Sequence, residues 1–115
     1  MLNKQITVLG LALISVTAYG HTQLSSSLPA DQATVAAAPE QLELAFSEDV
    51  TLTALSLQDA HGTSYELGAM PTSARREFAI PVPKLAAGSY SVTWRAVGAD
   101  THVVSGEIHF SVAIP

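Results

Sequence analysis

The chain has 115 residues and a formal net charge of −5, with 10 acidic and 5 basic side chains. It contains no cysteine, which excludes disulfides, thiolate metal sites and a cysteine nucleophile. Its acidic balance argues against nucleic acid or an anionic lipid surface as a partner.

The first 20 residues are predicted to be a cleaved secretory signal peptide. A short segment with one charge, on Lys4, precedes an apolar run at 6–16, and Ala18 and Gly20 put small residues where signal peptidase cuts. The apolar run is too short for a transmembrane helix, which needs ~20 residues. Cleavage would leave residues 21–115 as one exported domain, and His21 would carry the new terminal amine.

The exported domain is predicted to be an antiparallel β-sandwich of about seven strands. Short segments alternate apolar and polar residues with period two, and turn residues separate them. Strands are expected at 41–46, 51–58, 64–67, 76–80, 89–97 and 104–114, with a hairpin turn at 59–62. The prolines at 81 and 83 should mark an edge or a crossover. The segment 32–38 has only a weak pattern.

A candidate metal site lies between the last two predicted strands, at Asp100 and His102. If the tripeptide Asp100–Thr101–His102 is extended, the side chains of Asp100 and His102 project to the same side. His21 at a free terminus would add an imidazole and an amine, and three nitrogens with one oxygen suit Cu(II). Met70 is the only methionine beyond the signal peptide, so a methionine-rich Cu(I) site cannot form. The alternative is a hydrogen-bonded Asp–His turn pair that holds no metal.

Of four other side chains, His61 and Arg95 have both a structural and a functional interpretation, whereas His109 and Trp94 have a structural one. His61 lies in a predicted turn, where it is either an exposed residue or an accessory ligand. His109 lies on the polar face of the last strand and is predicted to be a surface residue. Trp94 lies on the same face of its predicted strand as Tyr90 and Val92 and is expected in the core. Arg95, on the opposite face, is either a surface cation or a residue that holds a ligand carboxylate.

The exported domain resembles the CopC-like periplasmic copper-binding proteins, a family that includes the YobA-type members. The resemblance extends over almost all of residues 21–115, and the segment 94–102 is its most specific part. It is carried by His21 at the cleavage point and by SSLPA at 26–30, LAFSE at 44–48, LAAGSY at 85–90, WRAVGADTH at 94–102 and GEIHF at 106–110.

The resemblance implies an Ig-like or cupredoxin-like Greek-key β-sandwich or barrel with one Cu(II) ion. The implied ligands are the terminal amine, His21, Asp100 and His102, with Glu48 as a weak or outer ligand. The alternative for Glu48 is a surface carboxylate beside Asp49. Family members with a second, Cu(I) site carry a methionine-rich loop, which this sequence lacks.

The implied function is periplasmic buffering, sequestration or delivery of Cu(II) by a monomer without enzymatic activity. A CopD-type inner-membrane copper transporter is the implied protein partner, and nucleic acid is not expected. Two alternatives stay open: a histidine-brace copper oxidase, against which the anionic Asp100 argues, and a metal-free β-sandwich interaction module. The sequence does not decide whether the same ligands also bind Zn(II) or Ni(II) in vitro.

Overall fold

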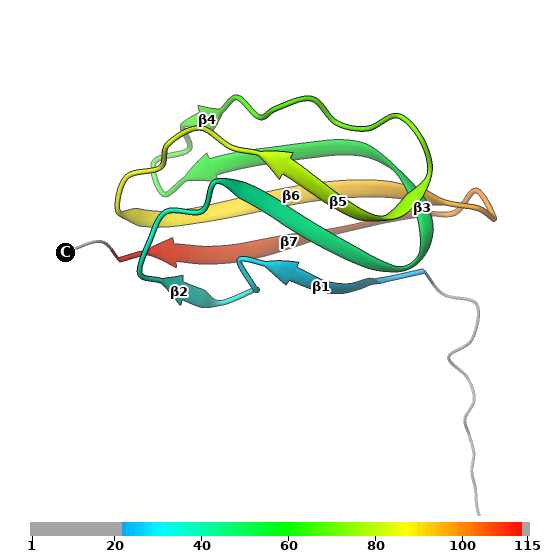
Figure 1. The fold of residues 1–115 in the computed structure, drawn as a ribbon, viewed down its shortest axis with the longest axis horizontal. Helices are drawn as coiled ribbons and strands as arrows, with labels where there is room; N and C mark the ends of the chain where they lie inside the picture. Colours follow the sequence, from blue (N-terminus) through cyan, green and yellow to red (C-terminus); the bar gives the residue numbers. More distant parts are fainter. Residues whose placement is uncertain (1–21, 114–115) are drawn as a thin grey trace, which may run out of the picture.

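Figure 1 shows a computed structural model of the chain, which describes residues 22–113. The strands, in chain order, are β1 (Leu24–Leu28), β2 (Ala33–Val35), β3 (Gln41–Asp59), β4 (Ser64–Tyr65), β5 (Arg75–Pro81), β6 (Gly88–Gly98) and β7 (Val103–Val112). The all-β fold with seven strands that the sequence predicts is confirmed. Between residues 22 and 113 there is no helix long and apolar enough to cross a membrane.

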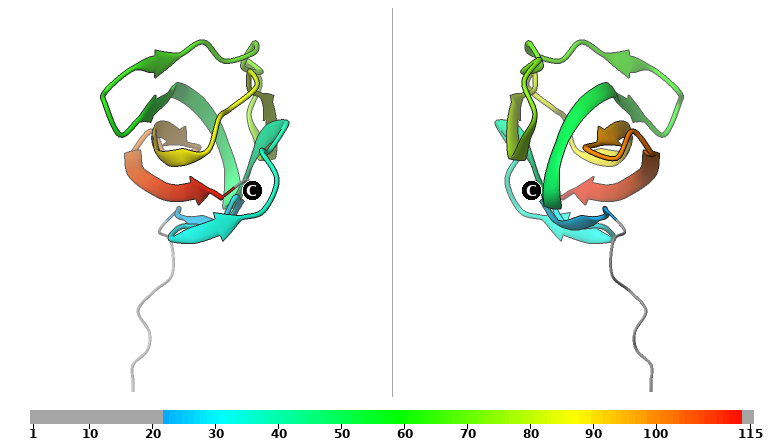
Figure 2. Two further views of the ribbon diagram at one scale, coloured as in Figure 1. Left: turned by 90° about the vertical axis from the view of Figure 1, so that its left-hand side faces the viewer. Right: turned by 90° about the vertical axis from the view of Figure 1, so that its right-hand side faces the viewer.

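The 19-residue strand β3 organises the fold because its two halves belong to different groups of strands. The first half pairs with β1 and β5, and the second half pairs with β6 and β4. Strand β7 joins β6, and β2 pairs with β7 in parallel. Between the halves, near residues 45–50, β3 bends and its register with β5 shifts. The end-on views in Figure 2 show the strands curling around a common interior.

The interior is filled by the apolar faces of the alternating strands. On β6 the buried residues are Tyr90, Val92, Trp94 and Ala96, as their spacing predicts. Phe46 from β3 meets the Trp94 indole edge to face, with ring centroids 5.2 Å apart. Such pairs add specific packing to the burial of apolar area. The core therefore reaches from the first half of β3 across to β6.

The structure differs from the sequence-based prediction in three places. The segments 41–46 and 51–58, expected as separate strands, are one continuous strand with a bend. Strands β1 and β2 were not predicted, and the parallel pairing of β2 with β7 departs from the purely antiparallel expectation. Strand β4 is only two residues long, because the chain leaves the sheet after Tyr65.

Two predicted features of the connections are confirmed. The turn at 59–62 closes with a 3.0 Å hydrogen bond from the Gly62 N–H to the Asp59 carbonyl. Gly62 has φ = +82°, a conformation that glycine adopts without strain. Pro81 is the last residue of β5, which pairs only with β3 among the described strands and so lies at an edge.

Candidate metal centre

The connection between β6 and β7 is a tight turn that brings Asp100 against His102. The Thr101 N–H donates to the Gly98 carbonyl at 2.9 Å, and the Gly98 N–H donates to the His102 carbonyl at 3.0 Å. Thr101 has φ = +68°, so residues 100–102 are not extended, and the condition on which the predicted convergence of the two side chains rested is not met. The two side chains do converge, but a turn rather than strand geometry is the reason.

Asp100 accepts hydrogen bonds from His102 with both carboxylate oxygens. The His102 backbone N–H donates to Oδ1 at 3.1 Å, and ring atom Nδ1 lies 3.0 Å from Oδ2. The backbone hydrogen bond, followed by the charge and ring contact of His102, lowers the pKa of Asp100 despite a smaller opposing effect of burial. An ionised carboxylate accepts from Nδ1–H, which fixes the orientation of the ring. The His102 side chain is 84% exposed, so its other ring nitrogen is accessible.

The first described residue, Thr22, lies beside this turn. A Cβ built on Gly98 would be 3.0 Å from Thr22 Oγ1 and 3.2 Å from Asp100 Oδ1. These two oxygens are therefore no more than about 6 Å apart, the sum of the two distances. His21, the remaining predicted ligand, lies outside the described residues.

Glu48 lies at the same end of the molecule as the Asp100 turn. It belongs to the part of β3 that bends, two residues before Val50, and Val50 pairs with Gly98. Figure 1 shows the bend of β3, the start of β1 and the β6–β7 turn at one end. The Glu48 side chain is exposed, and its neighbour Asp49 lies 3.7 Å from the guanidinium of Arg76.

The other two described histidines lie far from this turn. His61 follows Asp59, which pairs with Tyr90, whereas the turn follows Gly98. Tyr90 lies eight positions before Gly98 on β6, which corresponds to about 26 Å. His109 pairs with Ser91 at the same remote end and is exposed, as expected. His61 is therefore too distant to serve as an accessory ligand of the Asp100 turn.

Trp94 and Arg95 take the faces that the alternation predicts. The Trp94 side chain is buried, and its Nε1 has no hydrogen-bond partner among residues 22–113. Arg95 is exposed on the outer face of β6, and within the described part of the chain its guanidinium makes no ion pair. Among the described residues the Asp100 carboxylate is paired with His102 and not with Arg95.

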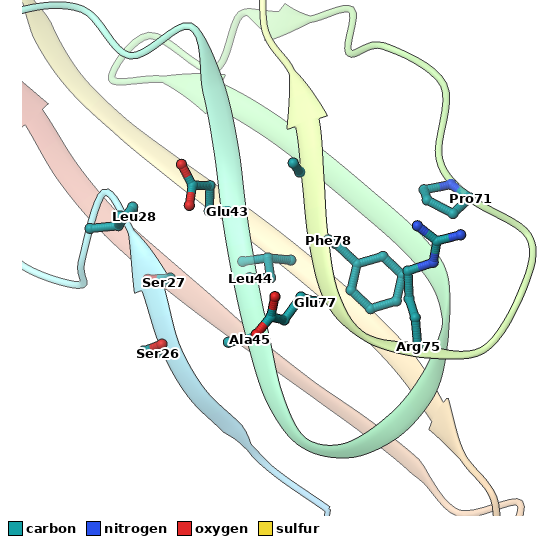
Figure 3. Close-up of a pocket in the computed structure, with 11 residues that line it drawn as sticks. Ser26, Ser27, Leu28, Glu43, Leu44, Ala45, Pro71, Arg75, Glu77 and Phe78 are labelled. Carbon is teal, nitrogen blue, oxygen red and sulfur yellow. The ribbon is translucent and has the colours of Figure 1, made fainter.

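Residues 22–113 contain no group of three His, Asp or Glu side chains that could hold a metal ion. A hollow of about 520 Å³ lies on the outer face of β1, β3 and β5 (Figure 3). It is lined by serines, alanines and larger apolar side chains, with Glu43, Glu77 and Arg75 as its charged groups. None of the predicted ligands lines it. The Asp100–His102 pair is therefore the candidate site, and it needs further ligands from outside the described range.

The comparison with known proteins decides the family, because the CopC domain family matches residues 24–113. The chain belongs to the CopC family. Copper resistance protein C of Escherichia coli is 36% identical and is covered over 98% of its length by 97% of this chain. The crystal structure of CopC from Methylosinus trichosporium OB3b matches with a TM-score of 0.71 and 29% identity, over 82% of this chain and 95% of that one.

A second solved structure marks a difference within the CopC family. PcoC from Escherichia coli, described as a methionine-rich copper resistance protein, matches with a TM-score of 0.67 and 33% identity, over 82% of this chain and all of PcoC. The present CopC-family chain has only two methionines, Met1 and Met70. The family is one of copper resistance proteins and not of enzymes, which agrees with the resemblance found in the sequence.

Proposed function

We propose that this CopC-family chain is a periplasmic Cu(II)-binding protein that buffers, sequesters or delivers the ion. One ion would be held by the terminal amine and imidazole of His21 together with Asp100 and His102. The observation that carries this proposal is the position of Thr22 beside the Asp100 turn. His21 is joined to Thr22 by a single peptide bond, so the two α-carbons are ~3.8 Å apart across a trans peptide.

The chemistry of the donor groups suits Cu(II). An amine, two imidazoles and a carboxylate provide three nitrogens and one oxygen, which favour Cu(II) over the sulfur-seeking Cu(I). Oδ2 of Asp100 and Nδ1 of His102 are 3.0 Å apart. Two ligands that are each about 2.0 Å from one ion and 90° apart have a similar separation, ~2.8 Å. Binding one metal through both atoms would require the proton on Nδ1 to move to the other ring nitrogen or to leave, because in the metal-free pair that proton lies in the hydrogen bond to Oδ2.

Export and cleavage are part of the proposed function, because the terminal amine exists only after residues 1–20 are removed. An uncleaved chain has an amide nitrogen at His21, which is a much poorer ligand than a free amine. Glu48 is proposed as an outer ligand because it lies at the same end as the turn. The chain would act as a monomer that passes copper to an inner-membrane transporter of the CopD type.

The test is a Cu(II) titration of the mature protein, residues 21–115, followed by electron paramagnetic resonance. The matched variants are His102→Ala, a glycine inserted before His21, and His109→Ala as a control at the remote end of β7. We expect one tight equivalent with a nitrogen-rich tetragonal spectrum, lost in the first two variants and retained in the control. Weak Cu(II) binding that is the same in the unaltered protein and in all three variants would overturn the proposal and favour a metal-free interaction module.

A further inference from the structure

Ser47 holds the start of the described chain with two hydrogen bonds to one residue. The Gln23 N–H donates to the Ser47 hydroxyl at 3.0 Å, and the Ser47 N–H donates to the Gln23 carbonyl at 2.9 Å. Both bonds join positions that are 24 residues apart in the sequence. The backbone of Gln23 thus has its donor and its acceptor satisfied by the same serine.

This attachment lies where the regular pairing of β1 with β3 is irregular. Strand β1 begins at Leu24, and its register with β3 shifts between Leu24 and Ser26. The bonds of Gln23 to Ser47 therefore continue the attachment of the chain beyond the end of β1. The side-chain hydroxyl supplies the acceptor for the Gln23 N–H. Loss of that hydroxyl would leave this exposed amide to water.

Thr22, the residue before Gln23, lies beside the turn that carries Asp100. A Cβ atom built on Gly98 would lie 3.0 Å from Thr22 Oγ1 and 3.2 Å from Asp100 Oδ1. Gln23 is thus hydrogen-bonded to Ser47 on β3, and Thr22 lies beside the turn that follows β6. A residue whose backbone donor and acceptor are both paired has lost much of its conformational freedom before any ligand binds.

We propose that Ser47 is a positioning residue for the copper site, which rests on the proposed function above. Its hydroxyl would fix residues 22 and 23 so that the amine and imidazole of His21 are held beside Asp100 and His102 before the metal arrives. Preorganisation of this kind raises affinity because less ordering has to accompany binding. Ser47 itself contributes no ligand.

The test compares Ser47→Ala with Ser47→Thr, which keeps the hydroxyl, in the mature protein. Ser89→Ala is the matched control, because the Ser89 hydroxyl lies 3.3 Å from that of Ser111 at the remote end of β6. We expect Ser47→Ala to weaken Cu(II) binding by roughly three- to tenfold, the factor corresponding to one hydrogen bond. Ser47→Thr and Ser89→Ala should bind as the unaltered protein does.

A second readout, amide hydrogen exchange of the metal-free protein, separates positioning from a general loss of stability. The Gln23 amide should exchange faster in Ser47→Ala, whereas amides in the centre of β6 should keep their protection. Unchanged Cu(II) affinity in Ser47→Ala would overturn this inference alone, whether or not the Gln23 amide exchanges faster. Failure of the unaltered mature protein to bind Cu(II) tightly would overturn the proposed function, and this inference with it.

Discussion

The indole of Trp94 packs directly against Gly106, its partner on the neighbouring strand β7. A Cβ at residue 106 would lie 2.8 Å from Cζ2 of the indole and 3.0 Å from its Nε1. The other side of Trp94 is in contact with Phe46, which comes from the first half of β3. The absence of a side chain at Gly106 therefore makes room for the largest residue of the core.

Gly106→Ala should destabilise the protein by about 1–3 kcal/mol, the usual cost of overpacking a well-packed core. The added methyl group has to displace the indole, which in turn is held by Phe46. Urea unfolding of the metal-free protein measures the effect, with Ser105→Ala, an exposed neighbour on β7, as the control. Equal unfolding midpoints for the two variants would show that the indole can shift without cost.

Trp94 also offers a spectroscopic test of where the metal binds. It is the only tryptophan, and it lies four residues before Gly98, about 13 Å along the strand that leads to the Asp100 turn. One equivalent of Cu(II) should quench its emission, whereas Zn(II), with a filled d shell, should not. His102→Ala should remove the quenching. Quenching that survives in His102→Ala would place the copper elsewhere.

The alternation of β6 and β7 was predictable from the sequence because burial on one face imposes a period of two. Strand β1 was not, because its sequence LSSSL has no such alternation and its place depends on pairing with β3. The attachment of β2 depends on Asp31, whose carboxylate accepts the His109 N–H at 2.8 Å. No local pattern reveals a contact between residues 78 positions apart.

The candidate site was predictable in its residues but not in its geometry. The sequence indicated Asp100 and His102 because these residue types at this spacing can meet. The positive φ of Thr101, which produces the turn, depends on hydrogen bonds to Gly98 that only the structure shows. Ser47 was missed because a serine within an apolar strand has no spacing that identifies its partner. Its contact with Gln23 arises from the pairing of β1 with β3.

Stability at high pH should depend on the hydrogen bond from the Tyr65 hydroxyl to Asp59, which is 3.0 Å long. This bond, with smaller effects of burial and of the Asp59 charge, raises the pKa of Tyr65 to about 12. The pKa of Tyr65 is higher in the folded protein than in the unfolded chain, where it is ~10. The hydrogen bond therefore makes its full contribution to the free energy of unfolding below pH ~10. It is then lost as the pH rises toward 12. Melting temperatures measured from pH 8 to 12 should fall more steeply for the unaltered protein than for Tyr65→Phe.

At low pH the same pair should act through Asp59. Partial burial raises the pKa of Asp59, but hydrogen bonds from the Thr63 N–H, the Tyr65 hydroxyl and the His61 N–H outweigh it and lower the pKa overall. The ionised Asp59 therefore contributes to the free energy of unfolding at pH values above its unfolded-state pKa of ~3.9. This contribution is lost as the pH falls through the lower pKa of the folded state. Asp59→Asn should flatten the loss of stability between pH 5 and 2. An equal loss of stability between pH 5 and 2 in Asp59→Asn and in the unaltered protein would contradict this assignment.

Binding of Cu(II) should stabilise the mature protein and protect its first strand. A ligand that binds only the folded state adds about 2.7 kcal/mol of stability when its concentration is 100 times the dissociation constant. In the proposed site the ion would link residue 21 to the turn after β6, and thereby tie the edge strand β1 (Leu24–Leu28) to β6, from which β3 separates it in the sheet. Amide exchange in β1 should therefore slow more than exchange in β4, at the other end of the molecule. A glycine inserted before His21 should abolish both the rise in melting temperature and the protection of β1. Stabilisation that persists in that variant would mean that the terminal amine is not a ligand.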